Sequence, residues 1–235
     1  MIKTENQGCS NCGARPQSVF CELDTIDLQL LESTKHALSV AKGELIFEER
    51  SIPRGLYCVS KGKIKITQTG VDGKEQIVHL AKDGDILGYR AILSGDAYSC
   101  SARALEAASL CFIPKTTFFL LVEKDAQLAL RIMHLFSKEL KASEQKITSI
   151  AQRPVKERIA QSLLLLRECY GVEADGVTIA LAITCEDIAN LVSATRETAA
   201  RLLFELKEDQ IIGFVGKKIE IVLHGELLKI ANVCD

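Results

Sequence analysis

The sequence of 235 residues lacks the features that mark several large classes of protein. It contains no apolar run of membrane-spanning length and no secretory signal, so we expect a cytoplasmic protein without a membrane partner. Its net charge of −2 excludes a general nucleic-acid coat, and any binding to nucleic acid must come from a local patch. No nucleophile–base pair, phosphate-binding loop or set of paired acids stands in a credible context, so we do not expect an enzyme.

Cysteine, by contrast, is abundant, with nine residues in the chain. In a reducing compartment these residues are not expected to form structural disulfides. They point instead to metal binding, to redox chemistry or to simple burial. The hydrophobic content of 47% is high enough for two compact domains, each with its own core.

Much of the first half of the chain has the pattern of short strands. Residues 1–22 are polar and cysteine-rich, and residues 24–39 have the periodicity of a helix. From residue 44 to residue 122, short apolar segments alternate with turn signals such as Asp72–Gly73. This spacing predicts a small antiparallel roll or barrel. The expected strands are 45–47, 56–60, 63–68, 76–81, 102–105 and 109–113.

A long helix is expected over residues 126–151. Its apolar positions follow alternating steps of four and three residues, interrupted by Ser143, which is the pattern of a coiled-coil seam. Packing of this helix against its own domain alone remains the alternative. The seam predicts a dimer interface formed by Met133, Phe136, Leu140, Ile147 and Ile150.

Residues 184–203 have the pattern of two short helices joined by a tight turn. Thr184 is the expected N-cap of the first helix, Ser193–Ala194 form the turn, and Thr195 caps the second helix. Arg side chains hydrogen-bond guanine and Glu accepts from cytosine in the major groove, so the pattern predicts a DNA-reading helix-turn-helix. An ordinary amphipathic helix with a solvated charged face is the alternative. The expected DNA-contacting face consists of Thr195, Arg196, Glu197, Ala200 and Arg201.

A hairpin is expected directly after this motif, with strands at 211–215 and 219–222. It would add a wing to the motif, and Lys217 and Lys218 at its tip suit contacts with phosphate. A solvated turn explains these two lysines equally well. A supporting helix is expected before the motif, from Pro154 to about Cys169.

Three stretches together resemble the CRP/FNR superfamily of bacterial transcription regulators. They are Gly-Asp-Ile-Leu-Gly at 84–88, the helix at 126–151, and Thr-Arg-Glu-Thr at 195–198 followed by Arg201 and Leu202. The resemblance covers nearly the whole chain from about residue 20. It implies a homodimer that binds a two-fold-symmetric operator in double-stranded DNA, with RNA polymerase as a further partner. It also implies a β-roll whose ligand or cofactor controls the DNA-reading helices.

The expected fold is therefore α+β. It has an N-terminal antiparallel β-roll similar to cyclic-nucleotide-binding domains, a long dimerisation helix and a C-terminal winged helix-turn-helix. We expect four parts: a cysteine-rich segment at 1–22, a sensor roll at 23–125, the dimerisation helix at 126–151 and a DNA-binding domain at 152–235.

A cyclic nucleotide is not the expected ligand of this roll. Members of the superfamily that bind one carry a Gly-Glu pair for the ribose and an Arg-Ser pair for the cyclic phosphate. The corresponding stretches here are Gly88–Tyr89–Arg90 and Tyr98–Ser99–Cys100, so Tyr replaces both the Glu and the phosphate-binding Arg. A buried phosphate without an Arg partner is unfavourable. Arg90 or Arg103 as a substitute is the alternative.

The stretches from Gly84 and from Ala104 to Pro114 are closer to the oxygen-sensing FNR branch. That branch has an N-terminal cysteine cluster and one cysteine in the roll, which together hold an oxygen-labile [4Fe–4S] cluster. The resemblance implies a metal site formed by Cys9, Cys12, Cys21 and Cys111. Four thiolates suit an iron–sulfur cluster, although the spacing C-x2-C-x8-C is longer at its second interval than in the best-known FNR pattern.

The implied function is a homodimeric DNA-binding regulator that senses oxygen or redox state. A bound zinc ion, a thiol–disulfide switch, a small organic effector of the roll and plain burial of Cys111 all remain alternatives. The other cysteines are interpreted as bystanders, and among them Cys100 is the one that could replace a missing ligand. They are Cys58, Cys100, Cys169, Cys185 and Cys234.

The DNA-reading helix resembles a different branch from the sensor. Arg196, Glu197 and Arg201 are similar to the set of the cyclic-AMP receptor branch, which reads TGTGA-like half-sites. The FNR branch has an apolar residue where Arg196 stands and Ser where Ala200 stands. We therefore expect a palindromic operator with TGTGA-like half-sites about one helical turn apart.

Overall fold

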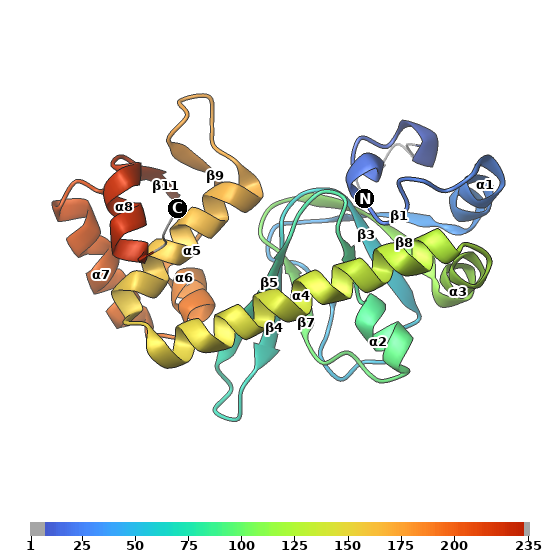
Figure 1. The fold of residues 1–235 in the computed structure, drawn as a ribbon, viewed down its shortest axis with the longest axis horizontal. Helices are drawn as coiled ribbons and strands as arrows, with labels where there is room; N and C mark the ends of the chain where they lie inside the picture. Colours follow the sequence, from blue (N-terminus) through green and yellow to red (C-terminus); the bar gives the residue numbers. More distant parts are fainter. Residues whose placement is uncertain (1–7, 233–235) are drawn as a thin grey trace. The chain divides into compact units, whose positions relative to one another are not determined.

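The computed structural model describes residues 8–232, which form two compact units (Figure 1). The first unit takes in the chain through Lys74 together with Val78–Leu140. The second takes in Glu75–Ile77 and the chain from Lys141 onward. The α+β class is confirmed, with strands and helices in both units. The predicted four-part division stays a prediction, and Cys234 lies outside the described residues.

The first unit contains a roll of two four-stranded antiparallel sheets, ordered β1-β8-β3-β6 and β2-β7-β4-β5. All six strands expected between residues 45 and 113 are present, shifted by no more than a residue at their ends. The strands are β1 (His36–Val40), β2 (Leu45–Phe47), β3 (Gly55–Lys61), β4 (Ile64–Thr69), β5 (Glu75–Ala81), β6 (Ile86–Leu87), β7 (Ser101–Ala104) and β8 (Ala108–Pro114).

The sheet that contains β3 and β8 is buried on both faces. Val59 and Leu110 point into the interior of the roll, where both sheets supply the core. Leu56 and Ile113 point to the opposite face and join an outer core. Both faces are apolar because helices and the N-terminal segment cover the outer one.

The elements that cover this outer face come from several parts of the first unit. They are η1 (Cys9–Asn11), η2 (Arg15–Gln17), α1 (Thr25–Thr34), α2 (Tyr89–Ser94), α3 (Lys115–Lys124) and the start of α4 (Ala126–Gln152). Figure 1 shows the N-terminal segment, in blue, beside β1 and β3. Gly84 permits its close approach, since a Cβ there would lie 3.0 Å from the Ala14 carbonyl oxygen, and Gly84 has a φ of +91°.

The helix expected over residues 24–39 is wrong in its second half. Helix α1 ends at Thr34, Lys35 is extended, and residues 36–40 form β1. Strand β1 pairs with β8 so that Ala37 lies opposite Cys111. Pairing with a strand distant in sequence therefore overrides the helical periodicity of this stretch.

The second unit is a winged helix-turn-helix, as expected. Its elements are α5 (Val155–Tyr170), β9 (Thr178–Ala182), α6 (Cys185–Val192), α7 (Arg196–Glu208), β10 (Ile212–Val215), β11 (Lys218–Ile221) and α8 (His224–Ala231). The wing is an antiparallel sheet ordered β10-β11-β9, whose third strand was not expected. No helix in the described part of the chain is long and apolar enough to cross a membrane.

Helix α6 begins with a complete capping box. The Thr184 hydroxyl accepts a hydrogen bond from the Asp187 backbone N–H at 3.0 Å, and the Asp187 carboxylate accepts one from the Thr184 backbone N–H at 3.4 Å. These bonds satisfy two donors that the first turn of a helix leaves without a partner.

We predict that Thr184→Ala destabilises α6 by about 1 kcal/mol, because it removes the hydroxyl acceptor. Hydrogen exchange of the amides of residues 185–192 measures this change. Thr148→Ala is the matched control, since Thr148 lies exposed within α4 and caps nothing. Equal exchange of the α6 amides in wild type and Thr184→Ala would contradict the prediction.

Candidate DNA-binding and thiol sites

Helices α6 and α7 have the geometry of the predicted helix-turn-helix. Ser193 ends α6 in the left-handed conformation with a φ of 56°, and Thr195 caps α7 by accepting from the Thr198 N–H at 3.2 Å. The buried side of α7 consists of Ala199, Leu202, Leu203 and Leu206. Its exposed side presents Arg196, Glu197, Ala200 and Arg201. The sequence therefore predicted the orientation of this helix, because burial follows its periodicity.

The two arginines of α7 form exposed ion pairs within the second unit. Arg201 pairs with Glu205 one turn along the helix, and the Nε of Arg196 lies 4.0 Å from a carboxylate oxygen of Glu186. The side chains of Arg196 and Arg201 are 69% and 64% exposed. Exposed pairs contribute little stability, so either guanidinium can exchange its carboxylate for a base or phosphate at small cost.

The two lysines of the wing lie in different environments. Lys217 is exposed in the turn between β10 and β11. Lys218 begins β11 and pairs with Glu173. Lys217 is thus better placed than Lys218 to bind a phosphate. The ion pair between Lys218 and Glu173 is itself partly exposed.

The interior of the roll is filled at the position where a cyclic phosphate would need a cation. Tyr98 is buried, stacks on Phe47 with ring centroids 4.1 Å apart, and donates a hydrogen bond to the Gly55 carbonyl at 3.2 Å. Gly88 lies against the same ring, since a Cβ at this position would be 2.9 Å from a Tyr98 ring carbon.

The two arginines considered as substitutes are engaged elsewhere. Arg103 donates to the Gly43 carbonyl at 2.8 Å. Arg90 and the Tyr89 hydroxyl both donate to the carboxylate of Glu139 on α4. Burial, followed by the hydrogen bond with Glu139, raises the pKa of Tyr89, so the phenol remains a donor to that carboxylate. These bonds link α2 to the first half of α4.

The structure brings three of the four predicted metal ligands to the outer face of the β3–β8 ladder. Cys111 lies on β8, and Cys9 is buried in the outer core that covers this face. The Cys12 sulfur lies 3.8 Å from the Ser60 hydroxyl oxygen on β3. Cys58, expected to be a bystander, is the direct cross-strand partner of Cys111.

Lys35 is the basic residue of this thiol group. Its side chain is hydrogen-bonded with Cys9, and its charge also acts on Cys111. Burial works to lower the pKa of Lys35, but the bond with Cys9 and the charges of Cys111 and Cys9 outweigh burial and raise it. Burial raises the pKa of Cys111, and the Lys35 ammonium opposes that change. An ammonium beside thiols favours their ionised, metal-binding form.

Cys21 and Cys100 lie apart from this group. The Cys21 backbone is held by hydrogen bonds with Arg15 and Ser18. Among the described residues, the charges that act on the Cys111 thiol are those of Lys35, Cys9 and Cys12. Cys100 packs against the interior core of the roll, on the other side of the sheet. Within residues 8–232, no three His, Cys, Asp or Glu side chains stand in the geometry of a bound metal.

The cysteine-rich segment is also tied to α4. The Nε of Arg131 donates to the Val19 carbonyl at 2.7 Å, and the same guanidinium pairs with Glu22 at 2.8 Å and with Asp125 at 3.2 Å. Arg131 therefore joins residues 19–22 to the start of the long helix.

Helix α4 has an apolar stripe that is buried in its first half and exposed further along. Leu128 and Ile132 are buried in the outer core, and Phe136 packs on Tyr89 with ring centroids 5.1 Å apart. The seam residues Leu140 and Ile147 lie within roughly 40° of Phe136 around the helix axis and are 62% and 68% exposed. Of the predicted interface residues, Phe136 thus contributes to its own unit, whereas Met133, Leu140, Ile147 and Ile150 are exposed.

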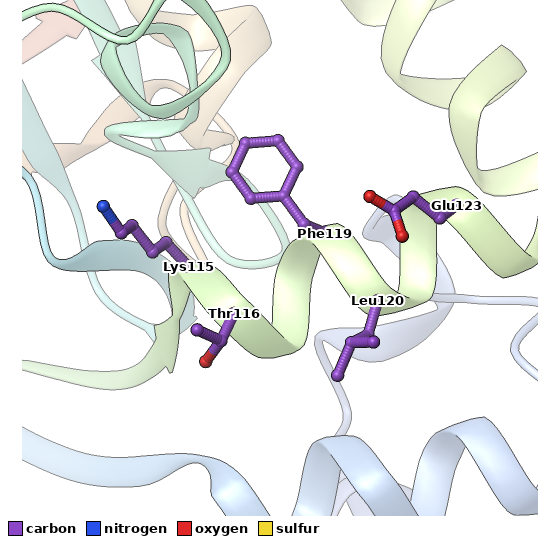
Figure 2. Close-up of a pocket in the computed structure, with 5 residues that line it drawn as sticks. All are labelled: Lys115, Thr116, Phe119, Leu120 and Glu123. Atoms are coloured by element: carbon purple, nitrogen blue, oxygen red, sulfur yellow. The ribbon is translucent and has the colours of Figure 1, made fainter.

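A surface hollow of about 450 Å³ lies along α3. Its lining consists of Lys115, Thr116, Phe119, Leu120 and Glu123. Figure 2 shows that all five side chains leave one helix and that Phe119 and Leu120 point to different sides. Because its polar groups do not converge, this hollow has no arrangement suited to catalysis.

Comparison with known families assigns both units. The pattern for the cyclic nucleotide-binding domain matches residues 37–125, and that for the Crp-like helix-turn-helix domain matches residues 157–230. Among solved structures, FixK2 from Bradyrhizobium japonicum superimposes with a TM-score of 0.76 at 24% identity, covering 86% of this chain and all of that one. At this level of sequence identity, the likeness to FixK2 shows a shared fold and nothing more.

Relatives with assigned roles are transcription regulators and not enzymes. The fumarate and nitrate reduction regulatory protein of Vibrio cholerae is 33% identical over 213 residues, which are 90% of this chain and 83% of that protein. The nitrogen fixation regulation protein FixK of Bradyrhizobium diazoefficiens is 30% identical over 94% of this chain and 93% of its own length. The chain therefore belongs to the CRP/FNR family of DNA-binding transcription regulators.

Proposed function

We propose that this regulator is a homodimer that senses oxygen or redox state through an iron–sulfur cluster bound by its N-terminal and roll cysteines. The observation that carries the proposal is the gathering of Cys9, Cys12 and Cys111 on one face of the sheet, from segments far apart in sequence. The names of several relatives agree with such a signal, among them two called anaerobic regulatory protein.

The donor set fits the group in its chemistry. Soft thiolates are the usual ligands of iron–sulfur clusters, and a C-x-x-C pair brings two of them from one turn of chain. A [4Fe–4S] cluster, when bound, supplies iron–sulfur bonds that oxygen attacks. The protein's own residues supply the rest: the ladder holds Cys111, η1 presents Cys9 and Cys12, and Lys35 places a positive charge beside them.

The signal reaches α4 through residues 8–22. Thiols that bind a common group fix this segment against the sheet, and Arg131 connects its last residues to the long helix. Ordering the segment therefore shifts the population of α4 conformations toward the one that dimerises and binds DNA.

Two other signals have less support. The stacked Tyr98 and Phe47 occupy the roll interior that an organic effector would need. A direct thiol switch needs accessible thiolates, yet burial raises the pKa of both Cys58 and Cys111. Neither signal explains why Cys9 and Cys12 approach the same sheet.

We predict that Cys111→Ser abolishes both the cluster and the oxygen response, because it removes a ligand held by the sheet. Anaerobic purification with iron and sulfide assays and an absorption spectrum, followed by exposure to air, measures this. Removing a residue that only hydrogen-bonds to a metal ligand lowers metal affinity roughly tenfold or more. Removing the ligand itself should lower the affinity by at least as much. Cys100→Ser is the matched control and should retain the wild-type cluster. A Cys111→Ser protein that responds to oxygen as wild type does would refute this mechanism.

The dimer forms through the exposed seam of α4. A seam of this kind buries apolar side chains only when a second helix covers it. Met133, Leu140 and Ile147 recur at seven-residue intervals, and all are exposed in the single chain. Continuity of this stripe with the buried face of α4 makes a parallel copy of the same helix the natural partner.

We predict that Leu140→Glu weakens the dimer by about 3 kcal/mol, because it buries a charge in an apolar seam, and so raises the dimer Kd by roughly 100-fold. Sedimentation velocity over a range of concentrations measures this Kd. Leu120→Glu, at a comparably exposed leucine of α3, is the control and should leave the dimer intact. An unchanged Kd for Leu140→Glu places the interface elsewhere.

The operator is a palindrome of TGTGA-like half-sites, with RNA polymerase as the expected partner at the promoter. Arg196, Glu197 and Arg201 share the exposed side of α7, near its N-terminus. This is the end of a recognition helix that meets base edges, and two arginines there favour half-sites containing G·C pairs.

We predict that Arg201→Ala costs roughly 1–3 kcal/mol on the TGTGA-type operator and relaxes discrimination at one base pair. Titration of anaerobic protein onto wild-type and singly substituted operators gives both quantities. Lys229→Ala removes the same charge from α8 and is the control. Selection from random DNA that returns TTGAT-type half-sites would contradict the role given to Arg196.

A further inference from the structure

The register of β3 and β8 gives Cys111 a thiol neighbour that the sequence pattern does not reveal. Cys58 is its direct partner in the ladder, and the next pair on the same face is Leu56 with Ile113. Directly opposed residues of an antiparallel pair point to the same face, with Cβ atoms about 5 Å apart. Since Leu56 and Ile113 belong to the outer core, Cys58 and Cys111 both face the covering segment.

The C-x-x-C pair of the N-terminal segment lies over the same two strands. The Cys12 sulfur lies 3.8 Å from the hydroxyl oxygen of Ser60, which follows Cys58 by two residues along β3. Cys111, Cys12 and Cys9 are the three thiols whose charges act on Cys58. The same two N-terminal thiols, together with Lys35, act on Cys111. Four cysteines therefore form one mutually interacting group.

Cys21 belongs to the part of the segment that runs to α4. Its neighbours Val19 and Glu22 are both bound by Arg131. Phe20, which lies between Val19 and Cys21, is buried in the outer core and anchors this stretch. Bringing the Cys21 thiol to Cys111 would require this anchored stretch to leave α4.

We propose that the metal site is formed by Cys9, Cys12, Cys58 and Cys111, and that Cys21 is not a ligand. The inference rests on the proposed function in that it names the ligands of the same site. Each thiol gives up its proton when it binds the metal. Two ligands come from adjacent positions of one ladder and two from one turn of the N-terminal segment, so the sheet presents half of the site ready formed. The long interval between Cys12 and Cys21 then places no strain on the site.

The first experiment compares ligand variants in iron binding. The full chain is reconstituted anaerobically with ferrous iron and sulfide, and iron and acid-labile sulfide are measured per chain for wild type, Cys58→Ser, Cys58→Ala and Cys21→Ser. Both Cys58 variants should lose iron by roughly tenfold or more, whereas Cys21→Ser should retain the wild-type content. Thermal unfolding without metal shows whether each variant is folded. A Cys58 variant that is folded and fully loaded, or a Cys21→Ser protein without iron, overturns the assignment.

A second experiment separates the ligand set from the kind of metal group. Cobalt(II) alone is titrated into the reduced protein, and the intensity of the thiolate-to-cobalt absorption reports how many thiolates bind. Four thiolates in wild type and in Cys21→Ser, with three or fewer in Cys58→Ser, support the assignment even where no iron–sulfur cluster assembles. Binding of cobalt by these four thiolates without assembly of a cluster would refute the proposed iron–sulfur cluster but support the four proposed ligands. If Cys21→Ser binds cobalt with one thiolate fewer and Cys58→Ser does not, the proposed set of ligands is wrong.

Alkylation gives a readout without substitution. In the cobalt-loaded wild-type protein, Cys21 should react with iodoacetamide at the rate seen in the metal-free protein, and Cys9 and Cys12 should become protected. Mass spectrometry of the digested chain identifies the modified residues. Protection of Cys21 by the metal contradicts the proposal.

Discussion

The antiparallel ladder between β3 and β8 is the constraint on which the first unit depends. One face of this ladder supplies Val59 and Leu110 to the interior of the roll, and the other supplies Leu56 and Cys58 to the outer core and carries Cys111 opposite Cys58. Because side chains alternate along a strand, a shift of one residue in both strands would exchange these faces. Burial on both sides therefore fixes the thiols opposite each other more firmly than any local sequence preference does.

The outer side of this sheet is connected to α4 by polar contacts. In the interior, Tyr98 stacks on Phe47, and none of the buried residues in the described part of the chain is an arginine. Two sets of polar contacts instead reach α4 from the outer elements. Arg131 binds the end of the cysteine-rich segment, and Glu139 binds α2. Both are short charge-assisted contacts, which transmit position as well as energy.

The sequence predicts those features whose signals are local. The caps at Thr184 and Thr195, the turn at Ser193 and the alternating strands of the roll all depend on neighbours within a few residues, and the structure contains them. It does not predict β1, because the pairing of Ala37 with Cys111 overrides a helical pattern. The proximity of Cys58 to Cys111 is a property of strand register, which a single sequence does not reveal.

The same ladder explains why a site so rich in thiols suits a bound metal better than a disulfide switch. Burial raises the pKa of Cys58 and of Cys111, and a protonated, covered thiol is a poor nucleophile toward oxidants. A metal displaces those protons and leaves negative charge in an apolar setting, which is unfavourable without compensation. Lys35, hydrogen-bonded with Cys9 and acting on Cys111, provides a positive charge at that place. Its position at the junction of α1 and β1 makes the end of that helix, unforeseen in the sequence, a part of the thiol site.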